Sequence, residues 1–409
     1  MTYFQFVAAN FRWLFAGLLL AFFSSFGQTF FIALSTGPIR HAYGLTSGEY
    51  GSLYMVATLA SAMILSFIGR AVDHHSIVKV AAVTTVMLAF ACVLLAVSSS
   101  ALWLILALFG LRLFGQGMMT HISLTAMAKW FVAGRGKAVS IAQLGFHFGQ
   151  VVLPIGFIVL IAWLGWRQSW LVAGAVLIIV ALPLIIFTAK NERNPKMLEP
   201  ESSEISSDLR QWTRNEMLRD PVFWLASTGI LAPPFIGTAI FFHQDFILAQ
   251  RGWPVELFAV GFVVLTVASI VFGLISGVII DRKSATALLP TSLIPLALGC
   301  FVLAFGGAEW TMILAMFLMG ISAGIGGAVL GSIWPEVYGT QHLGAIRSVV
   351  MALTVLFSAL GPGVLGWMID FQIGLKIQFL GLGIYCLLAS GAMAFSAWKY
   401  LQRGDLPGN

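Results

Sequence analysis

Residues 20–34 read LAFFSSFGQTFFIAL, an apolar run in which polar side chains are few and do not alternate with apolar ones. A strand of a membrane barrel would show about 10 residues of alternating polarity. The run instead lies inside a longer apolar segment, 13–36, and a helix needs roughly 20 apolar residues to cross a bilayer. The segment therefore predicts a membrane-spanning helix.

The rest of the chain has the same character. Hydrophobic residues make up 59% and charged residues 9% of the 409 residues, so most of the chain cannot form a water-exposed surface. We predict an all-α integral membrane protein with about 12 transmembrane helices. Their approximate positions are 13–36, 50–69, 79–99, 101–128, 138–163, 168–188, 222–248, 256–280, 286–306, 310–333, 345–368 and 376–399. Because no small-residue cleavage site follows the first, we expect it to be retained rather than removed as a signal peptide.

Lys and Arg residues are distributed unequally between the loops. If the N-terminus is cytoplasmic, the outer loops contain only Arg40, Arg167, Arg251 and Lys376. The inner loops and termini contain Arg12, Arg70, Lys79, Lys129, Arg135, Lys137, Lys190, Arg193, Lys196, Arg210, Arg214, Arg219, Arg282, Lys283, Arg347, Lys399 and Arg403. Because basic residues favour the cytoplasmic side, we expect both termini in the cytoplasm. The net charge of +6 has this explanation, and no aromatic-interleaved basic stripe indicates a nucleic acid partner.

A polar interval at 189–220 divides the chain into two halves. We predict an N-terminal six-helix bundle at 1–188, a cytoplasmic linker at 189–220 and a C-terminal six-helix bundle at 221–409. Within the linker, Ser207 and Asp208 are candidate caps for a short helix at the inner membrane surface.

The two halves align without gaps at an offset of 208 residues. TLAS at 58–61 corresponds to TVAS at 266–269, and Pro154 corresponds to Pro362. Gly69 and Asp73 likewise correspond to Gly277 and Asp281. The repeat predicts two bundles of the same orientation, related by pseudo-twofold symmetry.

Several motifs are similar to those of a known family. GRAVDHHSIVK at 69–79, its echo GVIIDRK at 277–283, RLFGQG at 112–117 and GWRQSW at 165–170 resemble the major facilitator superfamily (MFS) of secondary transporters. The resemblance covers the whole chain. KWFVAGRGKAVSIA, FFHQDFILAQRGW and WPEVYGTQHLGAIRSVV look most like bacterial members near the monocarboxylate and oxalate transporter branch. The resemblance implies the MFS fold, alternating access and a location in the bacterial inner membrane.

The resemblance also implies gating residues at the inner side: Gly69, Arg70, Asp73, Gly277, Asp281 and Arg282. The glycines would permit tight exits from helices 2 and 8, and the aspartates would lie near the positive N-terminal ends of the following helices. His74 departs from the family pattern, which has Arg or Lys after the aspartate, so we expect a weaker or pH-sensitive first motif.

Arg112 is the only Lys or Arg deep inside a predicted helix. A charge at the bilayer centre costs roughly 2.5–3.5 kcal/mol on insertion scales, so Arg112 must face a cavity or a partner. It could contact an anionic substrate, or it could hold the structure or switch partners during the cycle. Gln116 follows one turn later on the same face. Gln28 on helix 1 and Tyr54 on helix 2 are further substrate-binding candidates.

Helix 5 carries polar residues in register. Gln143, His147 and Gln150 share one face, opposite Gly145 and Gly149. A small-residue face beside a polar face suits a helix wedged between a neighbouring helix and a substrate site. We therefore predict substrate contacts at Gln143 and His147, and a proton-coupling role for His147, which can titrate near neutral pH.

Helix 7 contains Pro233 and Pro234, which should break it, followed by FHQD at 242–245. His243 is a candidate for substrate binding, and His243 and Asp245 are candidates for proton coupling.

The polar groups do not follow the repeat. Arg112, Gln143 and His147 correspond to Gly320, Met351 and Val355 in the second half. Where a sequence breaks its own pattern at a desolvation cost, function is the better explanation. The N-terminal half is thus predicted to hold the charged end of the substrate.

These observations favour a proton-coupled symporter of a small organic anion such as a monocarboxylate. The alternatives are proton-driven transport of a larger amphipathic compound, such as a drug or siderophore, and a transport-dead receptor or sensor. No phosphate loop, HExxH or GxSxG motif indicates an enzyme, and the three cysteines lack metal-ligand spacing. We expect no cofactor and no metal; the partners are a small-molecule substrate, protons and membrane lipid, and the chain is expected to be a monomer.

Overall fold

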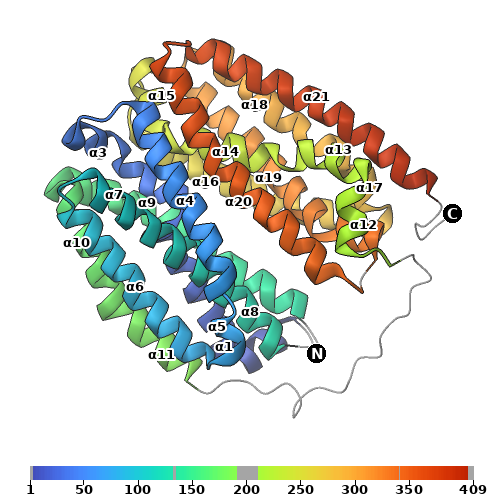
Figure 1. The fold of residues 1–409 in the computed structure, drawn as a ribbon, viewed down its shortest axis with the longest axis horizontal. Coiled ribbons are helices and arrows are strands. Elements are labelled where there is room, and N and C mark those ends of the chain that lie inside the picture. The colour runs from blue at the N-terminus through green and yellow to red at the C-terminus, as the bar shows by residue number, and fades with distance from the viewer. Residues whose placement is uncertain (1–2, 132–134, 191–210, 340, 404–409) are drawn as a thin grey trace. The chain divides into compact units, whose positions relative to one another are not determined.

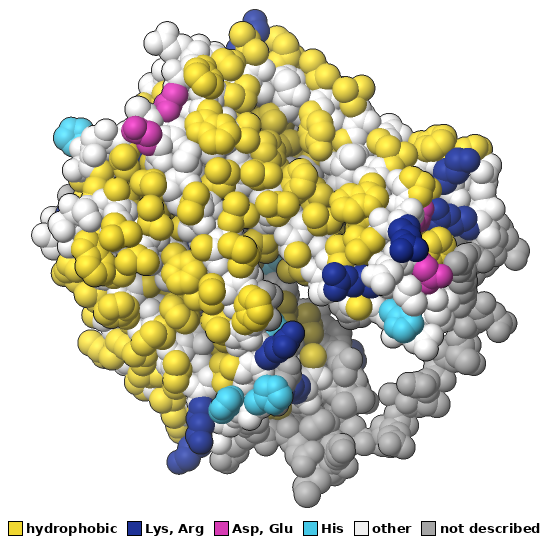
Figure 2. Space-filling model, in the orientation of Figure 1, with side chains coloured by type: hydrophobic (Ala, Val, Ile, Leu, Met, Phe, Trp, Pro, Cys, Tyr) yellow, Lys and Arg dark blue, Asp and Glu magenta, His cyan; other side chains and the backbone are white. Residues whose placement is uncertain are grey.

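The computed structural model describes residues 3–131, 135–190, 211–339 and 341–403. Within these residues the regular elements are helices, as the coiled ribbons of Figure 1 show. Eleven of them are long and apolar enough to cross a membrane, and the twelfth predicted segment, 50–69, folds as α4 (Ser47–Ile68). Hydrophobic side chains are spread widely over the face drawn in Figure 2, where charged side chains are few. The all-α membrane prediction is confirmed.

The chain divides into two compact units. The first contains residues 1–46 and 52–204, and the second contains residues 47–51 and 205–409. Most of α4 therefore belongs to the first unit, while its first turn belongs to the second.

Helix 1 of the first unit is discontinuous. α1 (Tyr3–Phe23) ends where a 3-10 turn, η1 (Ser24–Gly27), begins, and Gln28 has extended backbone angles, φ −81° and ψ 150°. The chain then resumes helical structure as α2 (Thr29–Ile32), η2 (Ala33–Ser35) and α3 (Thr36–Tyr43). The remaining helices are α4, α5 (Ala71–His74), α6 (Ile77–Val97), α7 (Ala101–Gly110), η3 (Leu111–Met119), α8 (Thr120–Trp130), α9 (Arg135–Leu164), α10 (Trp166–Val176), η4 (Leu177–Ala181) and α11 (Leu182–Ala189).

The predicted glycine face of helix 5 packs against helix 1. A side chain at Gly145 of α9 would lie 2.0 Å from the carbonyl oxygen of Leu18, and one at Gly149 would lie 2.2 Å from Ser25 Oγ. Glycine thus allows α9 and helix 1 to approach at backbone distance, as small residues do between membrane helices.

The second unit begins with α12 (Arg214–Arg219). Helix 7 is broken twice, into α13 (Pro221–Ile230), α14 (Ala232–Phe242) and α15 (Gln244–Arg251). Prolines occupy the first turn of α14, so the break predicted from Pro233 and Pro234 is confirmed. The remaining helices are α16 (Glu256–Arg282), α17 (Ala285–Leu288), η6 (Leu289–Leu293), α18 (Ile294–Phe305), α19 (Glu309–Tyr338), α20 (Leu343–Asp370) and α21 (Leu375–Gln402).

The repeated prolines occupy equivalent structural positions. Pro154 lies inside α9, and Pro362 lies inside α20. A proline inside a helix removes the hydrogen bond to the carbonyl four residues earlier. In α20 that carbonyl, on Ser358, lies 2.8 Å from Thr238 Oγ1 of α14, which shares its one proton between Ser358 and the Pro234 carbonyl at 2.6 Å. The internal proline thereby creates the acceptor that joins α14 to α20.

The linker helix starts later than predicted. Thr213 caps α12, and Glu216 bonds back to the Thr213 amide at 2.8 Å, which completes a capping box. Ser207 and Asp208 lie outside the described residues. Trp212 precedes the helix, and its amide donates to the carbonyl oxygen of Tyr338 at 3.0 Å.

A clasp of polar side chains ties the ends of the second unit together. Arg403 donates to both oxygens of Asp220, at 2.7 and 2.8 Å, and Tyr338 donates to Oδ2 at 2.8 Å. Asp220 also caps α13 through the amide of Val222. Burial alone raises the pKa of the Asp220 carboxyl, but the hydrogen bonds from Arg403, Tyr338 and Val222 outweigh it and hold that pKa below its usual value.

Asp220→Asn should lower the thermal unfolding temperature in detergent at neutral pH. The folded pKa of Asp220 lies below the unfolded one, so its contribution is complete above the unfolded pKa of about 3.9 and is lost as the pH falls through the folded pKa. Because Arg403 is 24% exposed, we expect the free energy of unfolding to fall by about 1–2 kcal/mol, a value between those of surface and buried ion pairs. The difference in unfolding temperature between wild type and variant should become smaller as the pH is lowered from 6 to about 3. A difference that is constant with pH would contradict this role.

Candidate functional site

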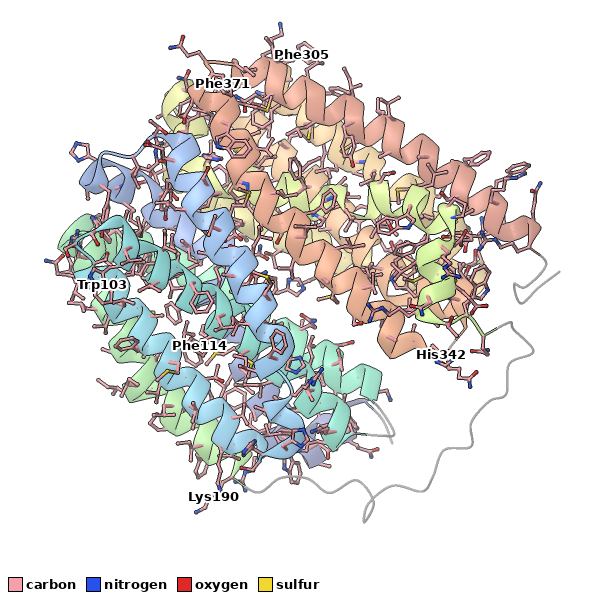
Figure 3. The ribbon with its side chains drawn as sticks, in the orientation of Figure 1. Trp103, Phe114, Lys190, Phe305, His342 and Phe371 are labelled. Atoms are coloured by element: carbon pink, nitrogen blue, oxygen red, sulfur yellow. The ribbon has the colours of Figure 1, made fainter. Side chains whose placement is uncertain are left out.

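Arg112 lies in a π-helical stretch of helix 4. Helix 4 runs through α7, η3 and α8, and η3 (Leu111–Met119) has π-helical hydrogen bonding. π-Helical turns are rare and occur frequently at functional sites. Figure 3 labels Phe114, which lies in η3 two residues after Arg112. The Arg112 side chain is 2% exposed, so a guanidinium is buried in the interior of the first unit.

The break in helix 1 supplies an acceptor for this guanidinium. In a continuous α-helix the amide of Phe31 would bond to the carbonyl of Gly27, but here it bonds to that of Gln28 at 3.1 Å. Arg112 Nη1 donates instead to the Gly27 carbonyl oxygen, at 3.2 Å. The charged side chain of helix 4 thus satisfies a backbone group that the break leaves without its usual donor.

Two glycines let the helices approach this closely. A side chain at Gly27 would lie 2.1 Å from the carbonyl oxygen of Leu111, and one at Gly115 would lie 2.6 Å from the Cα of Gly27. η1 and η3 therefore cross backbone to backbone beside Arg112.

Thr29 and Tyr54 complete the surroundings of the guanidinium. Arg112 Nη1 donates to Thr29 Oγ1 at 3.2 Å, and Thr29 Oγ1 and Tyr54 Oη are 2.8 Å apart. The guanidinium carbon lies 5.2 Å from the centroid of the Tyr54 ring, within cation–π range. Tyr54 is fully buried.

The charge of Arg112 is met by neutral groups. It contacts a carbonyl, a hydroxyl and an aromatic ring, and among the described residues no carboxylate forms an ion pair or hydrogen bond with it. Its Nε is buried and has no hydrogen-bond partner in the same part of the chain. A buried charge without a counter-charge is a site of strong attraction for an anion.

The other predicted substrate residues of the first unit lie near these helices. Gln28 is the buried residue at the break itself. Gln116 belongs to η3, and its Oε1 is buried without a hydrogen-bond partner in the described chain. Gln143 and His147 are half-buried on α9, and His147 Nδ1 also has no such partner. Among the described residues no hydrogen bond joins His147 to Arg112. Gln150, the third polar residue of this face, is buried.

The structure explains why Arg112 has no equivalent in the second half. Its counterpart, Gly320 of α19, lies against α16, and a side chain there would be 2.4 Å from the carbonyl oxygen of Leu265. The second unit uses this position for close helix packing, so a large side chain is excluded. In the first unit the broken helix 1 provides the acceptors that make an arginine possible.

His243 has a different environment from His147. It lies at the second break of helix 7, is fully buried, and its Nε2 is 2.8 Å from the carbonyl oxygen of Pro362. This contact joins helix 7 to α20. Asp245 follows in the first turn of α15 and is partly buried. The geometry gives His243 a packing contact in addition to its predicted roles.

The loop after helix 2 is held by helix 4. His121 Nε2 is 3.2 Å from the carbonyl oxygen of Gly69, and Lys129 Nζ donates to that of Val72 at 2.7 Å. Arg70 is exposed. The side chain of Asp73 lies outside the described residues.

In the second unit the expected tight exit at Gly277 is wrong. α16 continues through Gly277 to Arg282, and nothing lies within 4 Å of a side chain built at Gly277. The residues after Gly277 stay helical because Val278–Ile280 continue the apolar run. Arg282 is exposed at the helix end, and the Asp281 side chain lies outside the described residues.

Sequence reasoning missed three contacts. Gly27 and Thr29 were not predicted to hold Arg112, although the Ser-Ser-Phe-Gly-Gln-Thr segment signals a weak helix. Glu336 of α19 was also missed; its carboxylate accepts from the amides of Ala285 and Thr286, at 2.8 and 3.2 Å. No local pattern indicates this pairing, because the partners are about 50 residues apart.

The fold and the site define a multi-pass α-helical membrane protein with a buried intramembrane charge. The chain belongs to the Major Facilitator Superfamily, because the model of that family matches residues 14–362. It is therefore a membrane transporter rather than an enzyme.

Solved structures share the fold. A bacterial homologue of the human lysosomal transporter Spinster, crystallised in an inward-facing and unoccupied conformation, is 16% identical, with a TM-score of 0.73 over 98% of each chain. A mutant of the nucleoside transporter NupG is 13% identical, with a TM-score of 0.65 over 95% of this chain and 99% of that one.

A curated relative matches part of the sequence. The probable sulfoacetate transporter SauU of Cupriavidus necator is 28% identical over 160 residues. The match covers 39% of this chain and 37% of that relative.

Gly27→Ala should destabilise the first unit. The added methyl group would meet backbone atoms of η3, which cannot move aside as a side chain can. We expect a loss of about 1–3 kcal/mol, typical of overpacking, measured as a lower unfolding temperature in detergent. Gly156→Ala is the matched control, because nothing lies within 4 Å of that position in α9. Equal unfolding temperatures for the two variants would contradict the close crossing.

Proposed function

We propose that this transporter carries a small organic anion, a monocarboxylate or a compound of similar size, together with a proton. Arg112 carries the proposal. It is a buried cation whose hydrogen-bond partners are neutral, so an anionic substrate would supply the missing counter-charge.

The partial relative supports this substrate class. SauU is described as a probable sulfoacetate transporter, and sulfoacetate is a small organic acid. A carboxylate and a sulfonate present the same kind of oxygen acceptors to a guanidinium. Monocarboxylates and sulfoacetate therefore both belong among the compounds to be tested as substrates.

Proton coupling follows from charge. Moving one elementary charge against 100 mV costs about 2.3 kcal/mol, and taking up a proton with a monoanion avoids that term. His147 is the preferred proton carrier, because its half-buried ring has an Nδ1 without a hydrogen-bond partner among the described residues. His243 and Asp245 are the alternatives.

We further propose that the protein acts by alternating access as a monomer in a bacterial inner membrane. The excess of Lys and Arg in the predicted inner loops supports cytoplasmic termini. The six gating residues, Gly69, Arg70, Asp73, Gly277, Asp281 and Arg282, would act at that side.

The proposal predicts that an inward proton gradient drives accumulation in proteoliposomes of at least one of radiolabelled lactate, acetate or sulfoacetate. In His147→Ala the dependence on the gradient should be lost while exchange of labelled for unlabelled anion persists, because the variant lacks the proton carrier. His41→Ala is the control, since His41 is exposed on α3. Full gradient-driven uptake by His147→Ala would remove this residue from the mechanism. Wild-type binding without exchange would instead indicate a receptor, and transport of amphipathic cations in place of anions would indicate the drug-type alternative.

Arg112→Gln should reduce anion uptake by about two orders of magnitude, since a charge-assisted contact to a desolvated anion contributes on the order of 2–3 kcal/mol. Arg112→Lys should recover only part of the activity, because an ammonium cannot present a planar pair of donors. Arg40→Gln, in the last turn of α3, is the control. The measurement is the initial rate of anion uptake at equal protein density in the proteoliposomes. Normal uptake by Arg112→Gln would exclude the role assigned to Arg112.

A further inference from the structure

Two hydrogen bonds of Arg112 start from one nitrogen at the end of its guanidinium. Both leave from Nη1, one to the carbonyl of Gly27 and one to Thr29 Oγ1, each at 3.2 Å. A guanidinium nitrogen of this kind has two N–H groups, so both donors of Nη1 are engaged.

The edge of the guanidinium that contains Nε has a different environment. Nε is buried and has no hydrogen-bond partner among the described residues. The N–H group of Nε points along that edge and can donate to an oxygen of a carboxylate or of a sulfonate. The anchored end therefore determines which edge is offered to a ligand.

We infer that Thr29 and Tyr54 are positioning residues, which hold Arg112 so that its buried Nε–H group can donate to one oxyanion group of the substrate. The inference rests on the proposed anion transport and deepens it. Thr29 ties Nη1 in place, and Tyr54 bonds to Thr29 at 2.8 Å while its ring lies under the guanidinium. Neither residue needs to touch the substrate to set its affinity.

The break in helix 1 is part of this arrangement. Thr29 is the first residue after the extended Gln28, so its side chain and the Gly27 carbonyl converge on the same nitrogen. A continuous helix would engage that carbonyl with the amide of Phe31. The broken backbone thus fixes the direction of a side chain on a different helix.

Thr29→Val and Thr29→Ser test the inference. Valine keeps the shape of threonine without the hydroxyl, whereas serine keeps the hydroxyl. The readout is the apparent KM and the maximum rate for lactate and sulfoacetate in proteoliposomes, with lactamide as an uncharged competitor. Thr85→Val is the control, because the buried Thr85 hydroxyl bonds within its own helix, to the carbonyl of Ala81 at 2.8 Å.

Thr29→Val should raise the KM at least tenfold for the transported anion and change the maximum rate by less than about twofold, since a loosened guanidinium binds less well but the cycle is intact. Discrimination against lactamide should fall, and Thr29→Ser should return the KM to within about threefold of wild type. Tyr54→Phe should have a KM between those of Thr29→Val and Thr29→Ser. If the valine variant does not fold, the KM of Tyr54→Phe tests the inference instead.

The possible failures are distinguishable. If wild type transports none of the anions, the proposed function fails and takes the inference with it. If wild type transports one of them and Thr29→Val behaves like Thr85→Val, the proposed function survives and the positioning role is overturned. A lower unfolding temperature with an unchanged KM would likewise assign Thr29 a purely structural role.

Discussion

The hydrogen bond from Arg112 to the carbonyl of Gly27 connects most features of the first unit. A membrane interior offers no water, so every backbone group must find a partner within the protein. Helix 1 breaks at Gln28, and its displaced carbonyl is satisfied by a cation from helix 4. The same bond gives the buried guanidinium an acceptor. Each element would be unfavourable alone, and each is stabilised by the other.

Close backbone contact is the condition for this pairing. Gly27 and Gly115 let η1 and η3 cross without side chains between them, and Gly145 does the same between α9 and helix 1. The second unit applies small residues differently, since Gly320 occupies the position of Arg112 and lies against α16. One scaffold thus carries a polar cluster in one half and a tight apolar crossing in the other.

Three polar side chains of the second unit make packing contacts: Thr238, His243 and Asp220. Thr238 contacts the carbonyl that Pro362 leaves open, His243 bonds to the carbonyl of Pro362 itself, and Asp220 joins the start of helix 7 to Arg403. These contacts connect segments distant in sequence and hold breaks and helix ends in place. The uncompensated charge is in the first unit, which is why anion recognition is proposed there.

The sequence by itself determined the all-α membrane class, the internal repeat, the break in helix 7 and the glycine face of helix 5, because hydropathy, proline and spacing act locally. It also identified Arg112, since one charge inside an apolar run is conspicuous. Tertiary structure alone decided what Arg112 contacts: Gly27 and Thr29 are 85 and 83 residues away, and their partnership depends on a break that composition does not locate. The same reason explains Gly277, where the repeat suggested a helix exit but the backbone hydrogen bonds of α16 continue to Arg282. The hydropathy of the sequence determines which segments lie in the membrane, and long-range packing determines which of their residues contact one another.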